Sequence, residues 1–149
     1  MDEPARSLWA KTTLHVWPEP CRLVSLPQDA LEDAAALVAC ASHGFACLVV
    51  ERDEVSLTVS AAVWEESPLR ARARGDEGPF RVITFDLDLD LQVTGYLAPA
   101  AEALAAAGVP IVPQCAFLKD HVLVPEELLG DAVRALHALI ARAVATVTE

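Results

Sequence analysis

The chain has 149 residues, of which 54% are hydrophobic and 22% charged, so it can bury a sizeable core and is not a disordered tail. Acidic residues outnumber basic ones by 22 to 11, and the net charge of −11 argues against nucleic acid and anionic membrane surfaces as partners. No apolar run is long enough to span a membrane, and residues 1–6 do not resemble a secretory signal. We therefore expect a cytoplasmic protein.

The sequence carries none of the common short signatures of enzymes and metal sites. Phosphate-binding loops, dinucleotide-binding glycine motifs, hydrolase elbows and helical zinc motifs are all missing. No two of the four cysteines form a Cys-x-x-Cys pair, which predicts reduced thiols rather than a zinc site or a disulfide framework. We expect a protein without enzymatic activity, metal or cofactor.

The first helix is predicted from Pro27 to about Ser42, because Pro27 and Asp29 suit a helix start and small apolar residues follow on one side. Apolar runs at residues 44–50 and 54–59 then predict two strands joined by a turn. Between residues 61 and 79 there is room for a short helix at most, and the rest is predicted to be a loop.

Residues 80–93 alternate between apolar and polar side chains, which predicts a strand with one buried and one wet face. Its length suggests two consecutive strands with a break near Asp88. Asp86, Asp88 and Asp90 resemble the start of a calcium loop, but the later glycine and glutamate of such a loop are missing. We therefore interpret these three carboxylates as the wet face of the strand.

The remaining elements repeat the earlier order. A helix is predicted at residues 97–107, strands at 109–112 and 120–124, and an amphipathic helix from Pro125 to about Arg142. Pro110 and Pro113 lack an N–H group, so the strand that begins at Val109 should lie at a sheet edge or carry a bulge.

The order of helix, glycine, strand, turn and acidic strand occurs twice in the chain. Gly44 and Gly108 stand 64 residues apart, and Glu54 and Asp120 stand 66 apart. This spacing indicates a diverged internal duplication. We predict an α+β fold of two ferredoxin-like βαββαβ units with antiparallel sheets and helices on one face, comprising residues 12–86 and 87–149.

Two segments could carry chemistry. Cys115, Asp120 and His121 lie within seven residues and could form an activated thiolate, although a structural cysteine beside a histidine is the commoner explanation. Thr94 and Gly95 precede a helix N-terminus, where backbone N–H groups can receive a carboxylate; a tight turn alone would explain this glycine equally well.

The sequence resembles the small tandem ACT-domain proteins, which are related to the ACT modules of the cytosolic arginine-sensor family. The resemblance rests on residues 91–98, 99–104, 107–111 and 120–126, together with residues 23–27 and 53–57 of the first half. ACT domains are βαββαβ modules that bind amino acids or other small ligands, usually at an interface between modules, and regulate an attached or partner protein.

The resemblance implies a set of ligand-binding residues. Thr94 and Gly95 would meet the ligand's main-chain charges, Tyr96 beside them would also belong to the site, and Asp120 would pair with an ammonium or guanidinium group of the ligand. Cys115, Ala116 and Phe117 stand where the family has Ser-Thr-aromatic, so both hydroxyl groups are lost. Ser56 and Leu57 would line the opposing module.

Two hypotheses follow from the resemblance. The first is a non-enzymatic sensor that binds an amino acid at the interface between its ACT modules and regulates a partner. The alternative is a degenerate ACT-like protein that no longer binds a ligand and instead oligomerises, for example as a homodimer, through an exposed strand edge or helix face.

Overall fold

The computed structural model describes residues 3–41 and 44–148 and divides into two compact units. One is contiguous and spans residues 17–82; we call it the insert unit. The other combines residues up to 16 with those from 83 onward, and we call it the split unit. This division differs from the expected modules 12–86 and 87–149, because the segment before residue 17 belongs with the second half of the chain. The predicted helix end at Ser42 lies outside the described residues.

The insert unit has the strand order β3-β4-β2-β5, and its paired strands are antiparallel. Leu26, Leu57 and Trp64 lie at the centre of its core, each at most 1% exposed. Its elements are β2 (Cys21–Leu26), η1 (Gln28–Ala30), α2 (Leu31–Cys40), β3 (Cys47–Val50), β4 (Val55–Ser60), α3 (Ala61–Glu65), η2 (Pro68–Arg72) and the first part of β5 (Gly75–Asp86).

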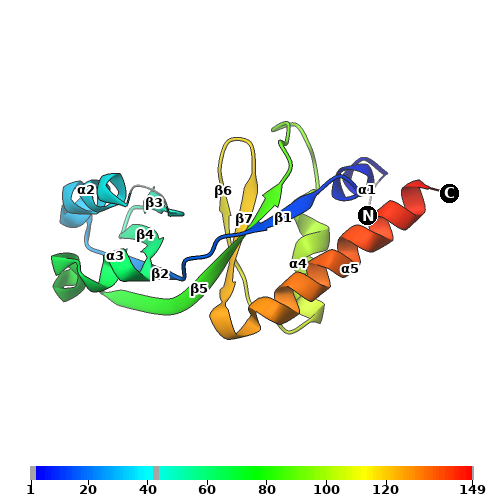
Figure 1. Ribbon diagram of the computed structural model, residues 1–149. Coiled ribbons are helices and arrows are strands. Elements are labelled where there is room, and N and C mark those ends of the chain that lie inside the picture. The colour runs from blue at the N-terminus through cyan, green and yellow to red at the C-terminus, as the bar shows by residue number, and fades with distance from the viewer. Residues whose placement is uncertain (1–2, 42–43, 149) are drawn as a thin grey trace. The chain divides into compact units, whose positions relative to one another are not determined.

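The split unit has the strand order β1-β5-β7-β6 and uses the last residues of β5, which pair with β1. Helices α4 and α5 lie side by side along its strands, and α1 packs against α5 (Figure 1). Its further elements are α1 (Glu3–Trp9), β1 (Thr13–Val16), α4 (Leu97–Ala106), β6 (Val112–Cys115), β7 (Asp120–Pro125), η3 (Glu126–Leu128) and α5 (Leu129–Val147).

Both units have the strand arrangement of a ferredoxin-like fold, which confirms the predicted fold class. In each sheet the second strand of the unit lies at one edge, followed by the third, the first and the fourth. The insert unit takes its four strands in chain order, whereas β1, from the beginning of the chain, is the fourth strand of the split unit. The predicted duplication is thus present as two units, the second of which is closed by the first residues of the chain.

Trp9 shows why this segment belongs to the split unit. Its side chain is fully buried, stacks on Tyr96 with ring centroids 4.8 Å apart, and meets the edge of Phe85. The indole Nε1 donates a hydrogen bond of 2.8 Å to the backbone oxygen of Tyr96. The sequence analysis assigned no role to this residue.

The predicted strand at residues 80–93 is wrong at both ends. The strand β5 begins at Gly75, in a segment predicted to be a loop, because residues 75–80 pair with β2. It ends at Asp86, so Asp88 and Asp90 are not part of a strand. The apolar and polar alternation continues beyond the strand without sheet pairing, so periodicity alone could not locate its end.

Other predictions are confirmed with small changes. The strand near Pro113 is β6, at the edge of the sheet, and it begins at Val112 rather than Val109. The last helix follows a 3-10 turn and runs to Val147, beyond the predicted end at Arg142. Its inward face is buried as predicted, with Leu136 at 0% and Ala143 at 1% exposure.

Candidate functional site

A pocket of about 320 Å³ lies in the split unit, between the start of α4, the β6–β7 hairpin and the segment after β5. This volume is at the lower end of the range for small-molecule sites. It is lined by Leu89, Asp90, Leu91, Val93, Gly95, Tyr96, Leu97, Ala98, Cys115, Ala116, Phe117, Leu118, Lys119 and Asp120.

The N-terminus of α4 forms one wall of the pocket. Gly95 has a φ of +77°, a conformation that favours glycine, and it turns the chain into the helix. Among the described residues, Tyr96 at the N-cap makes no side-chain cap bond, so the N–H groups of Leu97 and Ala98 can donate to an anionic group at this wall, whereas Pro99 has no N–H group.

Tyr96 fixes the position of this wall. Its hydroxyl group lies 2.7 Å from Thr12 Oγ1, and its backbone oxygen accepts the bond from Trp9. Burial raises the pKa of Tyr96 to about 12; the Thr12 hydrogen bond opposes this rise, and the nearby charge of Asp120 adds to it. The phenol therefore stays neutral near pH 7 and serves to hold the helix start in place.

The β6–β7 hairpin supplies the opposite wall. Cys115 and Asp120 face each other in the register of the two strands, and residues 116–119 form the turn between them. The turn is closed by a 2.9 Å hydrogen bond from the Ala116 N–H group to the Lys119 backbone oxygen. Asp120, the first residue of β7, thereby lines the same pocket as the start of α4, and its charge lies close enough to Tyr96 to affect that side chain.

Residues 87–93, which we call the strap, form a third wall. The strap is attached to the hairpin by a 2.8 Å hydrogen bond from the Leu89 N–H group to the Leu118 oxygen. Lys119 strengthens the attachment, because its Nζ lies 3.0 Å from Asp86 Oδ1 and also bonds Asp88. These carboxylates raise the pKa of Lys119, so its positive charge is engaged.

The pocket contains six of the nine predicted site residues and omits three. Those that line it are Gly95, Tyr96, Cys115, Ala116, Phe117 and Asp120. Thr94 is exposed in the loop beside it and does not line it. Ser56 and Leu57 lie on β4 of the insert unit, where Leu57 is completely buried in the core.

Sequence reasoning missed the strap and Lys119 as parts of the site. Leu89, Leu91 and Val93 line the pocket but were predicted to lie on the buried face of a strand. The signal was present in the alternating leucines, because apolar residues every second position also suit an extended segment that covers a pocket.

The arrangement of Cys115 and His121 argues against the thiolate hypothesis. Successive residues of a strand point to opposite faces, so His121 points away from the face that carries Asp120 and its register partner Cys115. The His121 ring is 8% exposed, and its Nδ1 lies 2.8 Å from Thr84 Oγ1. Burial lowers the pKa of His121, with Asp120 opposing the shift and Lys119 adding to it.

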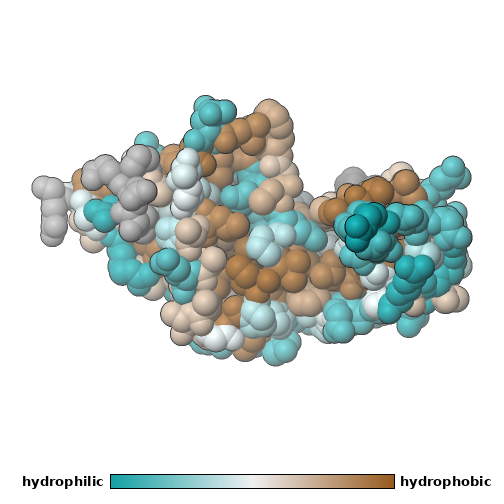
Figure 2. Space-filling view, turned by 180° about the vertical axis from the view of Figure 1, so that it is seen from behind, coloured by the Kyte–Doolittle hydropathy of each residue, from teal (hydrophilic) through white to brown (hydrophobic). Residues whose placement is uncertain are grey.

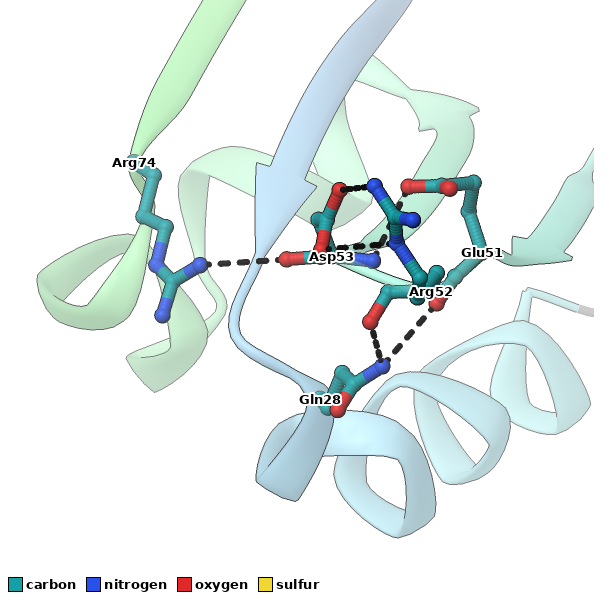
Figure 3. Close-up of polar contacts among 5 residues, drawn as sticks. All are labelled: Gln28, Glu51, Arg52, Asp53 and Arg74. Atoms are coloured by element: carbon teal, nitrogen blue, oxygen red, sulfur yellow. Dashed lines mark hydrogen bonds and ion pairs between the residues drawn. The ribbon is translucent and has the colours of Figure 1, made fainter.

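The equivalent place in the insert unit has a different character. Here a single residue separates β2 from η1, and the Gln28 side chain donates to the backbone oxygens of Glu51 (3.1 Å) and Arg52 in the β3–β4 turn (Figure 3). Arg52 pairs with Asp53, whose backbone oxygen also accepts from Arg74 at 3.2 Å. The hollow at this place is therefore lined by polar groups that bind one another.

Two arginines between residues 61 and 79, where the sequence predicts a short helix at most and a loop, also have partners within the insert unit. Arg72 bonds Asp29 at 2.6 Å and lies 3.6 Å from Asp33. Arg70 donates to the backbone oxygen of Glu65 at 3.0 Å. In the described ranges 3–41 and 44–148, no three His, Cys, Asp or Glu side chains are grouped to hold a metal ion, and no helix is long and apolar enough to cross a membrane.

The family comparison matches residues 77–138, from β5 into α5, to the model described as the ACT domain. Residues 77–138 are therefore similar to the ACT domain. This match includes the pocket and all its walls but not β1, which completes the sheet. No curated protein matches the sequence closely enough to count as a relative.

Solved structures are similar in fold over most of the chain. A Vibrio cholerae protein of unknown function, described as a possible transport protein, is 18% identical, with 93% of this chain and 97% of that one covered and a TM-score of 0.74. An Agrobacterium tumefaciens protein is 19% identical (87% and 89% covered, TM-score 0.64). The regulatory subunit of aspartate kinase from Thermus flavus is 17% identical (86% and 97% covered, TM-score 0.63). At these identities the similarity establishes the fold alone.

Proposed function

We propose that the protein is a non-enzymatic regulatory module that binds a free amino acid in the pocket of the split unit. The observation that carries the proposal is the pairing of two complementary groups across one small pocket. The uncapped N-terminus of α4 suits a carboxylate, and Asp120 suits an ammonium group. An α-amino acid carries both charges on adjacent atoms.

The comparisons support a regulatory role of this kind. The matched family is the ACT domain, and the similar aspartate kinase structure is a regulatory subunit rather than a catalytic one. The regulated part, attached or separate, would respond to occupancy of the pocket. Since the pocket is formed by the split unit, the proposal does not require Ser56 or Leu57 to touch the ligand.

A thermal-shift screen of the twenty amino acids, each at millimolar concentration, tests the proposal. We expect at least one to raise the melting temperature, because a ligand that binds only the folded state stabilises it. Asp120→Asn should weaken the binding of that amino acid by about tenfold or more, since a charge-assisted hydrogen bond is lost. Glu32→Gln, an exposed change in α2, is the matched control. Absence of stabilisation by all twenty would refute the proposal.

A second candidate function is oligomerisation through the insert unit. Strand β3 lies at the edge of its sheet, and its exposed valines, Val49 (48%) and Val50 (60%), are available to a second copy of the chain. Sedimentation velocity distinguishes the candidates. Dimers that form without ligand and dissociate on Val50→Lys, together with no thermal shift, would favour this alternative.

A further inference from the structure

Two separate segments supply apolar side chains to the pocket, beside the charged Asp90 and Lys119. The strap contributes Leu89, Leu91 and Val93, and the hairpin turn contributes Ala116, Phe117 and Leu118. The hydrogen bond between Leu89 and Leu118 ties these segments together. Asp120 and Cys115 lie on the stem of the hairpin, so the apolar side chains of the turn lie beyond the charged groups.

We propose that the ligand is an amino acid with a large apolar side chain, which lies between the strap and the hairpin turn. This inference rests on the proposed function and specifies its ligand. A ligand whose main-chain charges meet α4 and Asp120 places its side chain toward the turn. Most of the groups there are aliphatic or aromatic, and they gain from contact with an apolar side chain.

The charged groups near the strap are already engaged, which disfavours a charged ligand side chain. Asp86 and Asp88 both bind Lys119, and Asp90 Oδ1 accepts a 2.8 Å hydrogen bond from the Gln92 N–H group. A guanidinium or ammonium side chain that approached Asp86 or Asp88 would also meet the positive charge of Lys119. A carboxylate side chain that approached Lys119 would be repelled by Asp86 and Asp88.

Exposure of the apolar wall points to the same ligand class. Leu91 is 68% exposed, Phe117 is 75% exposed and Leu118 is 46% exposed. At the projecting tip of the β6–β7 hairpin and the strap, apolar atoms lie beside hydrophilic ones (Figure 2). A bound apolar side chain would remove part of this surface from water. A pocket of about 320 Å³ is large enough for a leucine or phenylalanine and too small for a long protein segment.

Isothermal titration calorimetry with six L-amino acids and glycine tests the inference. We expect leucine, methionine and phenylalanine to bind about tenfold or more tightly than glycine, and arginine, lysine and aspartate to bind no better than glycine. Tighter binding of arginine, lysine or aspartate would overturn the inference and leave the proposed function standing. If no amino acid binds, the proposed function itself fails.

A pair of surface variants locates the apolar contact. Phe117→Ser should weaken the binding of leucine by about tenfold and leave the binding of glycine nearly unchanged, because only the larger ligand reaches the turn. The matched control is Val144→Ser, which alters a 45% exposed valine of α5. Since Phe117 is mostly exposed, the variant is expected to fold, and its melting temperature without ligand checks this. Equal effects of Phe117→Ser on leucine and glycine, or no effect on leucine, would overturn the inference.

Discussion

Replacement of Trp9 by alanine should destabilise the split unit by an amount that can be estimated from its contacts. Removing a fully buried tryptophan costs about 3–5 kcal/mol, and the Tyr96 backbone oxygen, which loses the indole donor, adds about 1 kcal/mol. A loss of about 4–6 kcal/mol is a large part of the 5–15 kcal/mol typical of a domain. Trp9→Phe keeps an aromatic ring beside Tyr96 and should cost less than half as much.

Hydrogen exchange monitored by mass spectrometry, combined with urea unfolding, measures this effect in each unit. In Trp9→Ala the amides of β7 should lose protection, while those of β4 in the insert unit should keep it. Trp64→Ala, which removes the buried indole of the insert unit, should give the reverse pattern. If Trp9→Ala changed the free energy of unfolding by less than about 1 kcal/mol, the assignment of the first residues to the core of the split unit would be refuted.

Three further predictions concern single sites. Because burial lowers the pKa of His121, the unfolded state binds the proton more strongly, so stability should be level above the unfolded pKa of about 6.5 and fall as the pH drops below it. Urea unfolding of the wild type and of His121→Gln at several pH values tests this. If the free energy of unfolding depended on pH below about 6.5 as steeply in the variant as in the wild type, the prediction would be contradicted. Gly95→Ala should lower the free energy of unfolding by about 1–2 kcal/mol, because the φ of Gly95 is +77°. An added Cβ would meet no atom within 4 Å, so this cost comes from the backbone conformation alone. A neutral result in thermal unfolding would contradict that conformation. Near pH 7 iodoacetamide should label exposed Cys40 quickly and Cys21 only slowly, since burial raises the pKa of Cys21 to about 11; peptide mapping that finds equal labelling would contradict this.

The fold was predictable wherever local sequence determines structure. The helix starts near Pro27 and Pro125, the two hairpins and the duplicated order all follow from periodicity and helix-start residues. The partner of β1 was not predictable in this way. Strand pairing between residues 13–16 and 83–86 is nonlocal, and nothing in the four residues of β1 specifies which unit they complete.

The candidate site was predictable only where local sequence determines structure. Gly95 and Asp120 stand at an element start, where the chemistry of the position restricts the residue type. The strap escaped prediction because its leucines have the same alternation as the strand before them. What ends β5 at Asp86 is the lack of a neighbouring strand for the following residues, which is a property of the whole sheet.

The split unit has a consequence for folding during synthesis. The insert unit is contiguous, and the Trp17 N–H group donates a 3.0 Å hydrogen bond to the Val82 oxygen, so its ends meet as soon as residue 82 is available. Helix α1 is synthesised well before its packing partner α5. The buried face of α1, with Trp9, therefore stays uncovered on the ribosome until α5 has emerged, and during that time it is open to aggregation.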